Sequence, residues 1–300
     1  MVSKFEDIMK LAKTKEPKVL SVAVAQDIDV LISVKMAIEE GIIKAILVGD
    51  KEEILKIAKQ IDFHIDHVEI IDEKDKVEAC NIAVKKVTDK EADMVMKGII
   101  DTAVILKAVL NKEANLRTGR VLSHVGVMDI PGYDRVLLIS DAAMNIVPDL
   151  MTKKQIIDNS VIVARSIGID IPKVAMLCAK EKVNPKMQAT VDAKELEEMN
   201  KRGEIYNCIV GGPLALDNAV SLEAANHKKI DSPVAGKADI LIVPSIEAGN
   251  VLYKSLVFLA NAKAAGIIVG AKVPIVVTSR ADTKISKVNS IALAMLMTSN

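Results

Sequence analysis

The chain of 300 residues has few aromatic side chains and no net charge. Phe, Tyr and Trp make up only 2% of it and Trp is absent, which argues against the aromatic platforms on which nucleic-acid bases stack. With 40 basic and 40 acidic residues, the chain also lacks the positive excess that favours nucleic acid or an acidic membrane surface. We expect no nucleic-acid partner and no membrane partner.

Cysteines are also few: Cys80, Cys178 and Cys208 are scattered, without a CxxC pair. Their odd number and wide spacing give no disulfide framework, which favours a reducing compartment and a packing role for all three. The N-terminal stretch mixes acids and lysines and has no apolar signal core, and the longest uncharged stretch has thirteen residues, Val288–Asn300. Because a bilayer span needs ~18–20 residues, we expect a cytoplasmic protein.

The common phosphate-binding and catalytic motifs are missing as well. The sequence contains no GxGxxG, GxxxxGK[ST], HExxH or GxSxG pattern, so a phosphate group must be held by other means. His64 and His67 lie in "DFHIDH" beside two aspartates. Without further clustered ligands, a half-exposed strand edge at residues 62–67 is the better interpretation, and no metal site is expected.

Half of the residues are hydrophobic, and short apolar runs recur, each ending in a small or polar residue. The runs cover residues 18–27, 44–50, 67–72, 92–98, 123–129, 135–143, 173–178, 207–213, 238–245 and 274–278. Segments with helical patterning separate most of them, for example 29–40, 51–61, 74–90 and 153–167. This alternation predicts an α/β fold with a mostly parallel sheet, whose ligands bind beyond the carboxyl ends of the strands. The stretch "IPGY" between Asp129 and Arg135 predicts one antiparallel hairpin.

Polar residues follow three of the predicted strands at the point where each ends. These residues are Ser279, Arg280 and Asp282 after 274–278, Ser140 and Asp141 within 135–143, and Glu247, Gly249 and Asn250 after 238–245. Polar clusters on loops after buried strands are candidate sites, and a glycine there allows a backbone to approach a ligand closely. Helix caps and turns are the ordinary alternatives for each of them.

Arginine is informative because only six of the 40 basic residues are Arg. A lysine-biased chain keeps arginine where its planar fork is useful, as in binding phosphate or carboxylate. Arg117 and Arg120 lie in the turn-like stretch "NLRTGR", close to His124, and Arg280 follows a predicted strand. A surface salt bridge is the ordinary fate of any one of them, but for Arg117 and Arg280 together we favour an anion site. A core residue is the default interpretation of His124.

Five segments, in order along the chain, resemble the phosphate acyltransferase family and in particular its butyryl branch. They are "ADMVMKGIIDTAVILKAVLNKEANLRTG", "SDAAMNIVPDL", "GGPLALDNAVS", "SPVAGKADILIVPSIEAGNVLYK" and "VPIVVTSRADTK". The resemblance implies a two-lobed α/β/α fold of the isocitrate/isopropylmalate dehydrogenase-like kind, with the active site in the interdomain cleft. We place the first lobe at residues 1–120 plus 275–300 and the second at 121–274. The resemblance also implies a homo-oligomer, a dimer at least.

The activity that the resemblance implies is reversible transfer of a butyryl group between CoA and inorganic phosphate, with acyl-CoA as a substrate and no further cofactor. Such a site needs cations for the phosphate, donors for a tetrahedral oxyanion and a group that manages the thiol proton. From the resemblance we assign Ser279 and Arg280 to catalysis and Arg117 and Arg280 to phosphate, and we add Asp282 as a catalytic candidate from its position after the motif. Residues assigned to CoA or substrate binding are Arg120, Asp141, Glu247, Gly249 and Asn250.

One position departs from the acetyl branch of the family, in which an aspartate regarded as the thiol base follows the motif arginine by six positions. This chain has Ser286 there, so Asp282 becomes the nearest replacement, with Glu247, Asp141 and His124 behind it. A free thiol with a pKa of ~8.5 needs only modest help. Acetyl or branched-chain acyl transfer, a dehydrogenase on the same fold and a CoA-binding regulator without turnover remain the alternatives, since a pocket separates acyl chains by only ~1–3 kcal/mol per methylene.

Overall fold

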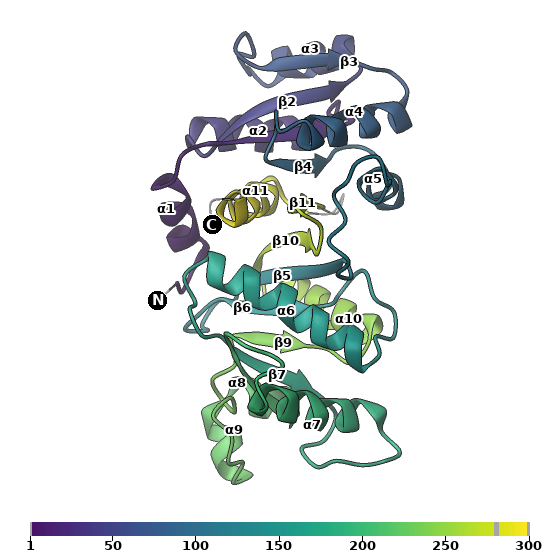
Figure 1. Cartoon of the computed structure of the whole chain (residues 1–300). Coiled ribbons are helices and arrows are strands. Elements are labelled where there is room, and N and C mark those ends of the chain that lie inside the picture. Colours follow the sequence, from purple (N-terminus) through teal and green to yellow (C-terminus); the bar gives the residue numbers. More distant parts are fainter. Residues whose placement is uncertain (1, 279–281, 299–300) are drawn as a thin grey trace. The chain divides into compact units, whose positions relative to one another are not determined.

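The computed structural model describes residues 2–278 and 282–298, which form a mixed α/β structure (Figure 1). The chain divides into two compact units. The first unit comprises Glu6–Arg120 and Ala265–Asn300, and the second unit comprises Met1–Phe5 and Val121–Ala264. The division drawn from the sequence stays a prediction. The two units differ from it at residues 1–5 and 265–274, the latter because β10 (Lys263–Val269) pairs with β11 (Ile275–Val276).

In the first unit, the strands lie in the order β3-β2-β1-β4-β11-β10. Their bounds are β1 (Lys18–Ala23), β2 (Ile43–Gly49), β3 (Glu69–Asp72) and β4 (Met94–Lys97), followed by β10 and β11 as above. β1 pairs in parallel with β2 and β4, β11 runs parallel to β4, and β10 is antiparallel to β11. The carboxyl ends of β1, β4 and β11 therefore meet at one edge of the sheet.

Acidic caps begin several helices of the first unit. Its helices are α1 (Phe5–Lys13), α2 (Ile28–Glu39), α3 (Lys51–Gln60), α4 (Lys76–Thr88), α5 (Thr102–Val109) and α11 (Lys284–Thr298). Asp27, Asp50 and Asp75 each accept two backbone N–H groups of the first turn of α2, α3 and α4, which satisfies donors that a helix leaves open. α11 is buried from Lys287 to Leu296 and packs against α2, so this helix contributes to the core.

The second unit has the strand order β5-β6-β9-β7-β8. Its strands are β5 (Ser123–Asp129), β6 (Leu137–Ser140), β7 (Lys173–Leu177), β8 (Ile209–Leu214) and β9 (Ile240–Ile242). β5 and β6 form the predicted antiparallel hairpin, with Gly126 opposite Ile139, and this prediction is confirmed. The pairs β6–β9, β9–β7 and β7–β8 are parallel, so the polar residues that follow β6 and β9 emerge side by side.

Helices of the second unit pack around this sheet and enclose an aliphatic core. They are α6 (Leu150–Ser166), α7 (Gln188–Lys201), α8 (Leu216–Val220), α9 (Leu222–His227) and α10 (Ile246–Phe258). The core gathers Ala, Val, Leu, Ile and Met side chains, Met128, Ile139 and Leu241 among them. A buried ion pair joins α6 to α7, with 2.6 Å between Lys153 Nζ and Asp192 Oδ2.

The prediction of a strand edge at residues 62–67 was wrong. Asp62 has a φ of 52° and follows the end of α3, and the segment continues as turns and irregular backbone before β3. His64 is exposed and its Nε2 lies 3.7 Å from Asp62 Oδ1. Among the described residues no strand pairs with this segment, so its alternation of polar and apolar residues belongs to a loop. No helix within residues 2–278 and 282–298 is both long and apolar enough to cross a bilayer.

Candidate functional site

A pocket of about 130 Å³ opens in the first unit at the carboxyl edge of its sheet. Its lining comes from the end of β4, from the segments that follow β1, β4 and β11, and from the helices α2 and α11. The lining residues are Asp27, Asp29, Val30, Lys97, Gly98, Ile99, Thr278 and Lys287. Open α/β sheets bind ligands beyond the carboxyl ends of their strands, so this is the position that the strand pattern predicted for a site. We name it the strand-edge pocket.

Two lysines of the strand-edge pocket are nearly buried, with 7% of Lys97 and 3% of Lys287 exposed. Lysine is rarely this buried unless a partner or a function keeps it there. The Lys97 ammonium donates to the carbonyl oxygen of Ile100 at 2.8 Å, and the Lys287 ammonium donates to the carbonyl oxygen of Asp282 at 2.7 Å. Two cations thus have defined positions in one small pocket. Sequence analysis missed both because lysine supplies most of the positive charge of this chain and no local pattern reveals burial.

Gly98 brings the end of β4 against the backbone that follows β1. A Cβ at this position would lie 2.1 Å from the carbonyl oxygen of Val24 and 2.6 Å from that of Ala23. The amide of Gly98 donates to Ala23 at 2.8 Å, and the amide of Ile99 donates to Val24 at 3.0 Å. Val24 has a φ of 56°, which a β-branched residue adopts only under constraint. The wall of the pocket is therefore a backbone junction that only glycine fits.

Arg117, predicted to bind phosphate, and Arg120, predicted to bind CoA or substrate, lie on one segment of the first unit. Arg117 and Arg120 are exposed on the loop after α5, where the Arg117 Nε donates to the carbonyl of Leu110. Arg117 forms an isolated β-bridge with Ala271, and the Thr118 hydroxyl donates to the carbonyl of Gly270, so this loop lies beside the β10–β11 connection.

Two of the predicted catalytic residues, Ser279 and Arg280, lie outside the described residues. Asp282 is half-buried, and its carbonyl accepts the Lys287 ammonium. Whether Arg117 and Arg280 converge on one anion stays a prediction.

In the second unit, the predicted residues after β6 form a compact loop. Asp141 is 2% exposed, and its carboxylate accepts the backbone amides of Ala143, Met144 and Asn145 at 2.9, 3.0 and 3.1 Å. The side-chain amide of Asn145 adds a fourth hydrogen bond at 2.6 Å. A carboxylate with this many donors acts first as the anchor of its loop. A direct part for Asp141 in binding CoA stays a prediction.

The start of α10 packs against this loop. Asn250 Nδ2 donates to the carbonyl of Ala142 at 3.3 Å, and a Cβ at Gly249 would lie 2.7 Å from the carbonyl oxygen of Asp141. The structure thus brings Asp141, Gly249 and Asn250 together, as expected of residues that follow adjacent parallel strands. Glu247 is exposed in the first turn of α10. Its role, like theirs, stays a prediction.

His124 is a core residue of β5, as its default interpretation held. It is 8% exposed, and its ring meets that of Tyr253 edge to face, with 5.7 Å between centroids and 70° between planes. The Ser140 hydroxyl donates to the carbonyl of His124 at 2.8 Å and ties β5 to the end of β6. An aromatic pair of this geometry stabilises a core and holds the imidazole in place.

The cysteines have the properties of packing residues. Burial raises the pKa of Cys80 and Cys178 to about 11 and that of Cys208 to about 12, so the reactive thiolate form is scarce at neutral pH. Within the part of the chain that the structure describes, no group of three or more His, Cys, Asp or Glu side chains is arranged to hold a metal ion.

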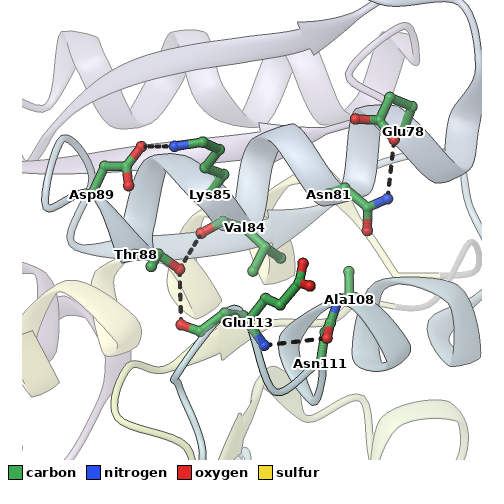
Figure 2. Close-up of a pocket in the computed structure, with 10 residues that line it drawn as sticks. Glu78, Asn81, Val84, Lys85, Thr88, Asp89, Ala108, Asn111 and Glu113 are labelled. Carbon is green, nitrogen blue, oxygen red and sulfur yellow. Dashed lines mark hydrogen bonds and ion pairs between the residues drawn. The ribbon is translucent and has the colours of Figure 1, made fainter.

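A second pocket of the first unit, of about 430 Å³, lies along α4 and α5 (Figure 2). Figure 2 shows most of its polar side chains bonded to close neighbours in the chain, whereas the Thr88 hydroxyl also donates to the carbonyl of Ala114 at 2.9 Å. Lys85 pairs with Asp89 one turn later, and Asn81 donates to Glu78 at 3.1 Å. These are the spacings of ordinary pairs on an exposed helix face, which contribute a few tenths of a kcal/mol each. We therefore regard this pocket as a surface groove.

Comparison with known proteins gives concordant matches over the whole chain. A family model described as "Phosphate acetyl/butaryl transferase" matches residues 3–81 and 73–295. A "Phosphate butyryltransferase" of Clostridium beijerinckii is 50% identical over 297 residues, which cover 99% of this chain and 98% of that protein. A "Phosphate acetyltransferase" of Thermotoga maritima is 48% identical over 289 residues, or 96% of this chain and 98% of that protein. The crystal structure of a branched-chain phosphotransacylase from Enterococcus faecalis matches with a TM-score of 0.82 at 36% identity, covering 94% of this chain and 99% of that one.

Proposed function

We propose, from the premise that this chain belongs to the phosphate acetyl/butyryl transferase family, that it is a phosphate butyryltransferase, an acyltransferase that moves a butyryl group reversibly between CoA and inorganic phosphate. The family resemblance that the sequence predicted is confirmed. The observation that carries the proposal is the identity to a butyryltransferase over nearly the full length of both chains. Acetyl transfer is the second candidate, because an acetyltransferase relative is almost as similar.

The reaction itself defines what the site must supply. Toward acyl phosphate, a phosphate oxygen attacks the thioester carbon, a tetrahedral oxyanion forms, and the carbon–sulfur bond breaks to release CoA as a thiolate that then takes a proton. Holding both substrates in one ternary complex removes much of the entropic barrier. Fixed cations and hydrogen-bond donors stabilise the oxyanion and the phosphate charge.

The proposal keeps the roles predicted from the sequence together with the family resemblance. Ser279, Arg280 and Asp282 take part in catalysis, Arg117 and Arg280 bind phosphate, and Arg120, Asp141, Glu247, Gly249 and Asn250 bind CoA or substrate. Two placements support them. Thr278, which directly precedes the Ser279–Arg280 pair, lines the strand-edge pocket, and the carbonyl of Asp282 is bonded to a lysine of the same pocket.

Asp282 remains our candidate for the group that manages the thiol proton. Ser286, which stands where the acetyl branch has its aspartate, is engaged at the start of α11. Its amide donates to the Thr283 hydroxyl at 3.1 Å, and the two hydroxyl oxygens lie 3.1 Å apart. This arrangement is typical of a helix cap formed by the Thr283 side chain, so Ser286 lies in the capped first turn of α11.

Three broader expectations belong to the same proposal. The dehydrogenase-like class of the fold with its interdomain active site, the homo-oligomer and the use of CoA without any further cofactor all rest on the family resemblance.

Thiol release from butyryl-CoA tests the proposal directly. Purified protein is mixed with butyryl-CoA, with and without inorganic phosphate, and the free thiol is measured with a colorimetric reagent. We expect phosphate-dependent release, and across acetyl-, propionyl-, butyryl-, isobutyryl- and hexanoyl-CoA we expect the highest kcat/KM for butyryl-CoA. Release that needs no phosphate, or no release, rejects the transferase, and an absorbance change of a nicotinamide cofactor would favour the dehydrogenase alternative.

A further inference from the structure

The strand-edge pocket places two nearly buried ammonium groups beside a buried hydroxyl, in a family whose reaction uses a free anion. We propose that Lys97, Lys287 and Thr278 form a subsite that binds inorganic phosphate, and in the reverse direction the phosphoryl group of the acyl phosphate. This inference rests on the proposed function and adds residues to it that neither the sequence pattern nor the family resemblance assigned. Thr278 is 6% exposed, so all three side chains are held by the fold.

The size of the pocket favours a small ligand. Pockets for drug-sized molecules measure ~300–1,000 Å³, whereas this one measures about 130 Å³, the volume of about four water molecules at ~30 Å³ each. The nucleotide and pantetheine arms of CoA exceed this space. A phosphate ion or a short acyl chain does not.

The charge of the pocket decides between those two ligands. An anion gains from both ammonium groups, and an apolar acyl chain gains from neither. The Ile100 and Asp282 carbonyls accept hydrogen bonds from Lys97 and Lys287 and so orient the two ammonium groups. Each ammonium has three N–H donors, and hydrogen bonds from lysine to phosphate are among the strong, charge-assisted class.

Two carboxylates, Asp27 and Asp29, also line the pocket, and their positions affect how strongly it attracts an anion. Asp29 is exposed. Asp27 caps α2, and its Oδ1 accepts the amides of Asp29 and Val30 at 3.1 and 3.0 Å. A carboxylate at this position faces the partial positive charge of a helix N-terminus, which offsets part of its own. Among the charged residues known to line the pocket, Lys97 and Lys287 are more buried than Asp27 and Asp29.

Charge removal at each lysine tests the subsite. Lys97→Met and Lys287→Met keep a long side chain and delete the ammonium group, and Lys59→Met removes an exposed lysine of α3 as a matched control. The KM for phosphate and the KM for butyryl-CoA are measured separately, and phosphate binding without acyl-CoA is measured by isothermal titration calorimetry. We expect the KM and Kd for phosphate to rise about tenfold or more in either pocket variant, with the KM for butyryl-CoA within about twofold of wild type. Lys287→Arg, which keeps the charge, should recover part of the loss.

The outcomes separate the subsite from the proposed function. An unchanged phosphate KM and Kd in folded Lys97→Met and Lys287→Met proteins overturns the subsite, and so does a rise confined to the KM for butyryl-CoA. If the lysine variants do not fold, Thr278→Val decides, because it deletes only the hydroxyl at constant shape: a raised phosphate Kd supports the subsite and an unchanged one rejects it. Lysine-dependent phosphate binding in a protein that releases no thiol would reject the transferase and leave the subsite standing.

Discussion

The side chain of Lys287, in the first turn of α11, donates a hydrogen bond to the backbone carbonyl of Asp282, 2.7 Å away. The bond is local in sequence, but Lys287 is 3% exposed and also lines the strand-edge pocket. A single buried ammonium thus connects the C-terminal side of the predicted catalytic motif to the candidate anion subsite. Substitutions in and around this motif can therefore be tested for distinct effects.

Arg280→Ala should lower kcat/KM for phosphate by ~10²–10³, the usual cost of losing one fixed charge or donor in such a site. Arg202→Ala is the matched control, because Arg202 is exposed and paired with Glu195 and Glu204. Steady-state kinetics with butyryl-CoA and phosphate measure both. Near-normal activity of Arg280→Ala would show that the phosphate is held without it.

Asp282→Asn should reduce kcat by ~10²–10⁴ if Asp282 manages the thiol proton, which is the range for a general acid or base. The pH–rate profile identifies the cause, because loss of the base removes the part of the profile in which the rate rises as that base ionises. Ser286→Ala provides the control, since Ser286 is engaged at the helix cap. A profile of unchanged shape in Asp282→Asn would reject Asp282 as the base.

Gly98→Ala should destabilise the protein by about 3 kcal/mol or more, because a Cβ there would lie 2.1 Å from a backbone oxygen that no rotamer change relieves. Gly41→Ala is the comparison, since its Cβ would meet nothing within 4 Å and only its φ of 74° resists the change. Urea unfolding should show a clearly larger loss for Gly98→Ala. Equal losses would mean that the junction between β1 and β4 relaxes easily.

Lys153→Met should lower the free energy of unfolding by about 3–5 kcal/mol, because it leaves the Asp192 carboxylate buried without its cation. The double variant Lys153→Met, Asp192→Leu should lose less than the single variant, since no buried charge remains. A double-mutant cycle by chemical denaturation measures the coupling. Additive losses would indicate that the two side chains do not interact.

Asp239→Asn should stabilise the protein at neutral pH. Asp239 accepts the amide of Lys173 at 2.8 Å, and burial raises its pKa, with hydrogen bonding and the nearby Arg135 opposing the shift. A carboxyl whose pKa is raised by folding favours the folded state at low pH and disfavours it once the pH exceeds the folded pKa. The gain in unfolding free energy should therefore be present at pH 7, shrink as the pH falls through the raised pKa of folded Asp239, and vanish below about pH 4, the ordinary pKa of a free aspartate. A gain that is independent of pH would point to another cause.

Much of the fold follows from the sequence because most strands are short apolar runs with polar ends. β10 was not predicted, because its sequence does not show this pattern. Its sequence, "KAAGIIV", opens with small residues and follows the apolar end of α10 with little polar sequence between them. β11 is shorter than predicted, with two residues in place of five, because only Ile275 and Val276 find partners on β10 and β4. Pairing is a tertiary property, so composition alone overestimates such a strand.

The candidate site likewise contains residues that the sequence analysis singled out and residues that it missed. Sequence analysis placed Asp141, Gly249 and Asn250 after predicted strands, but their proximity follows from the parallel pairing of β6 with β9, which only the structure reveals. Lys97 and Lys287 were missed, because "MVMKG" and "KISKV" look like an ordinary strand end and an ordinary exposed helix turn. Only the packing around them shows that these two ammonium groups are enclosed.

The order of the two units along the chain has a consequence for how the protein is made. The strands β5 to β9 of the second unit all lie between Val121 and Ala264. The core of the first unit, in contrast, includes α11, which begins at Lys284. Domains fold as units while the ribosome extends the chain. The apolar face of α2 in the nascent first unit therefore stays uncovered while the whole second unit is synthesised, until α11 emerges to pack against it.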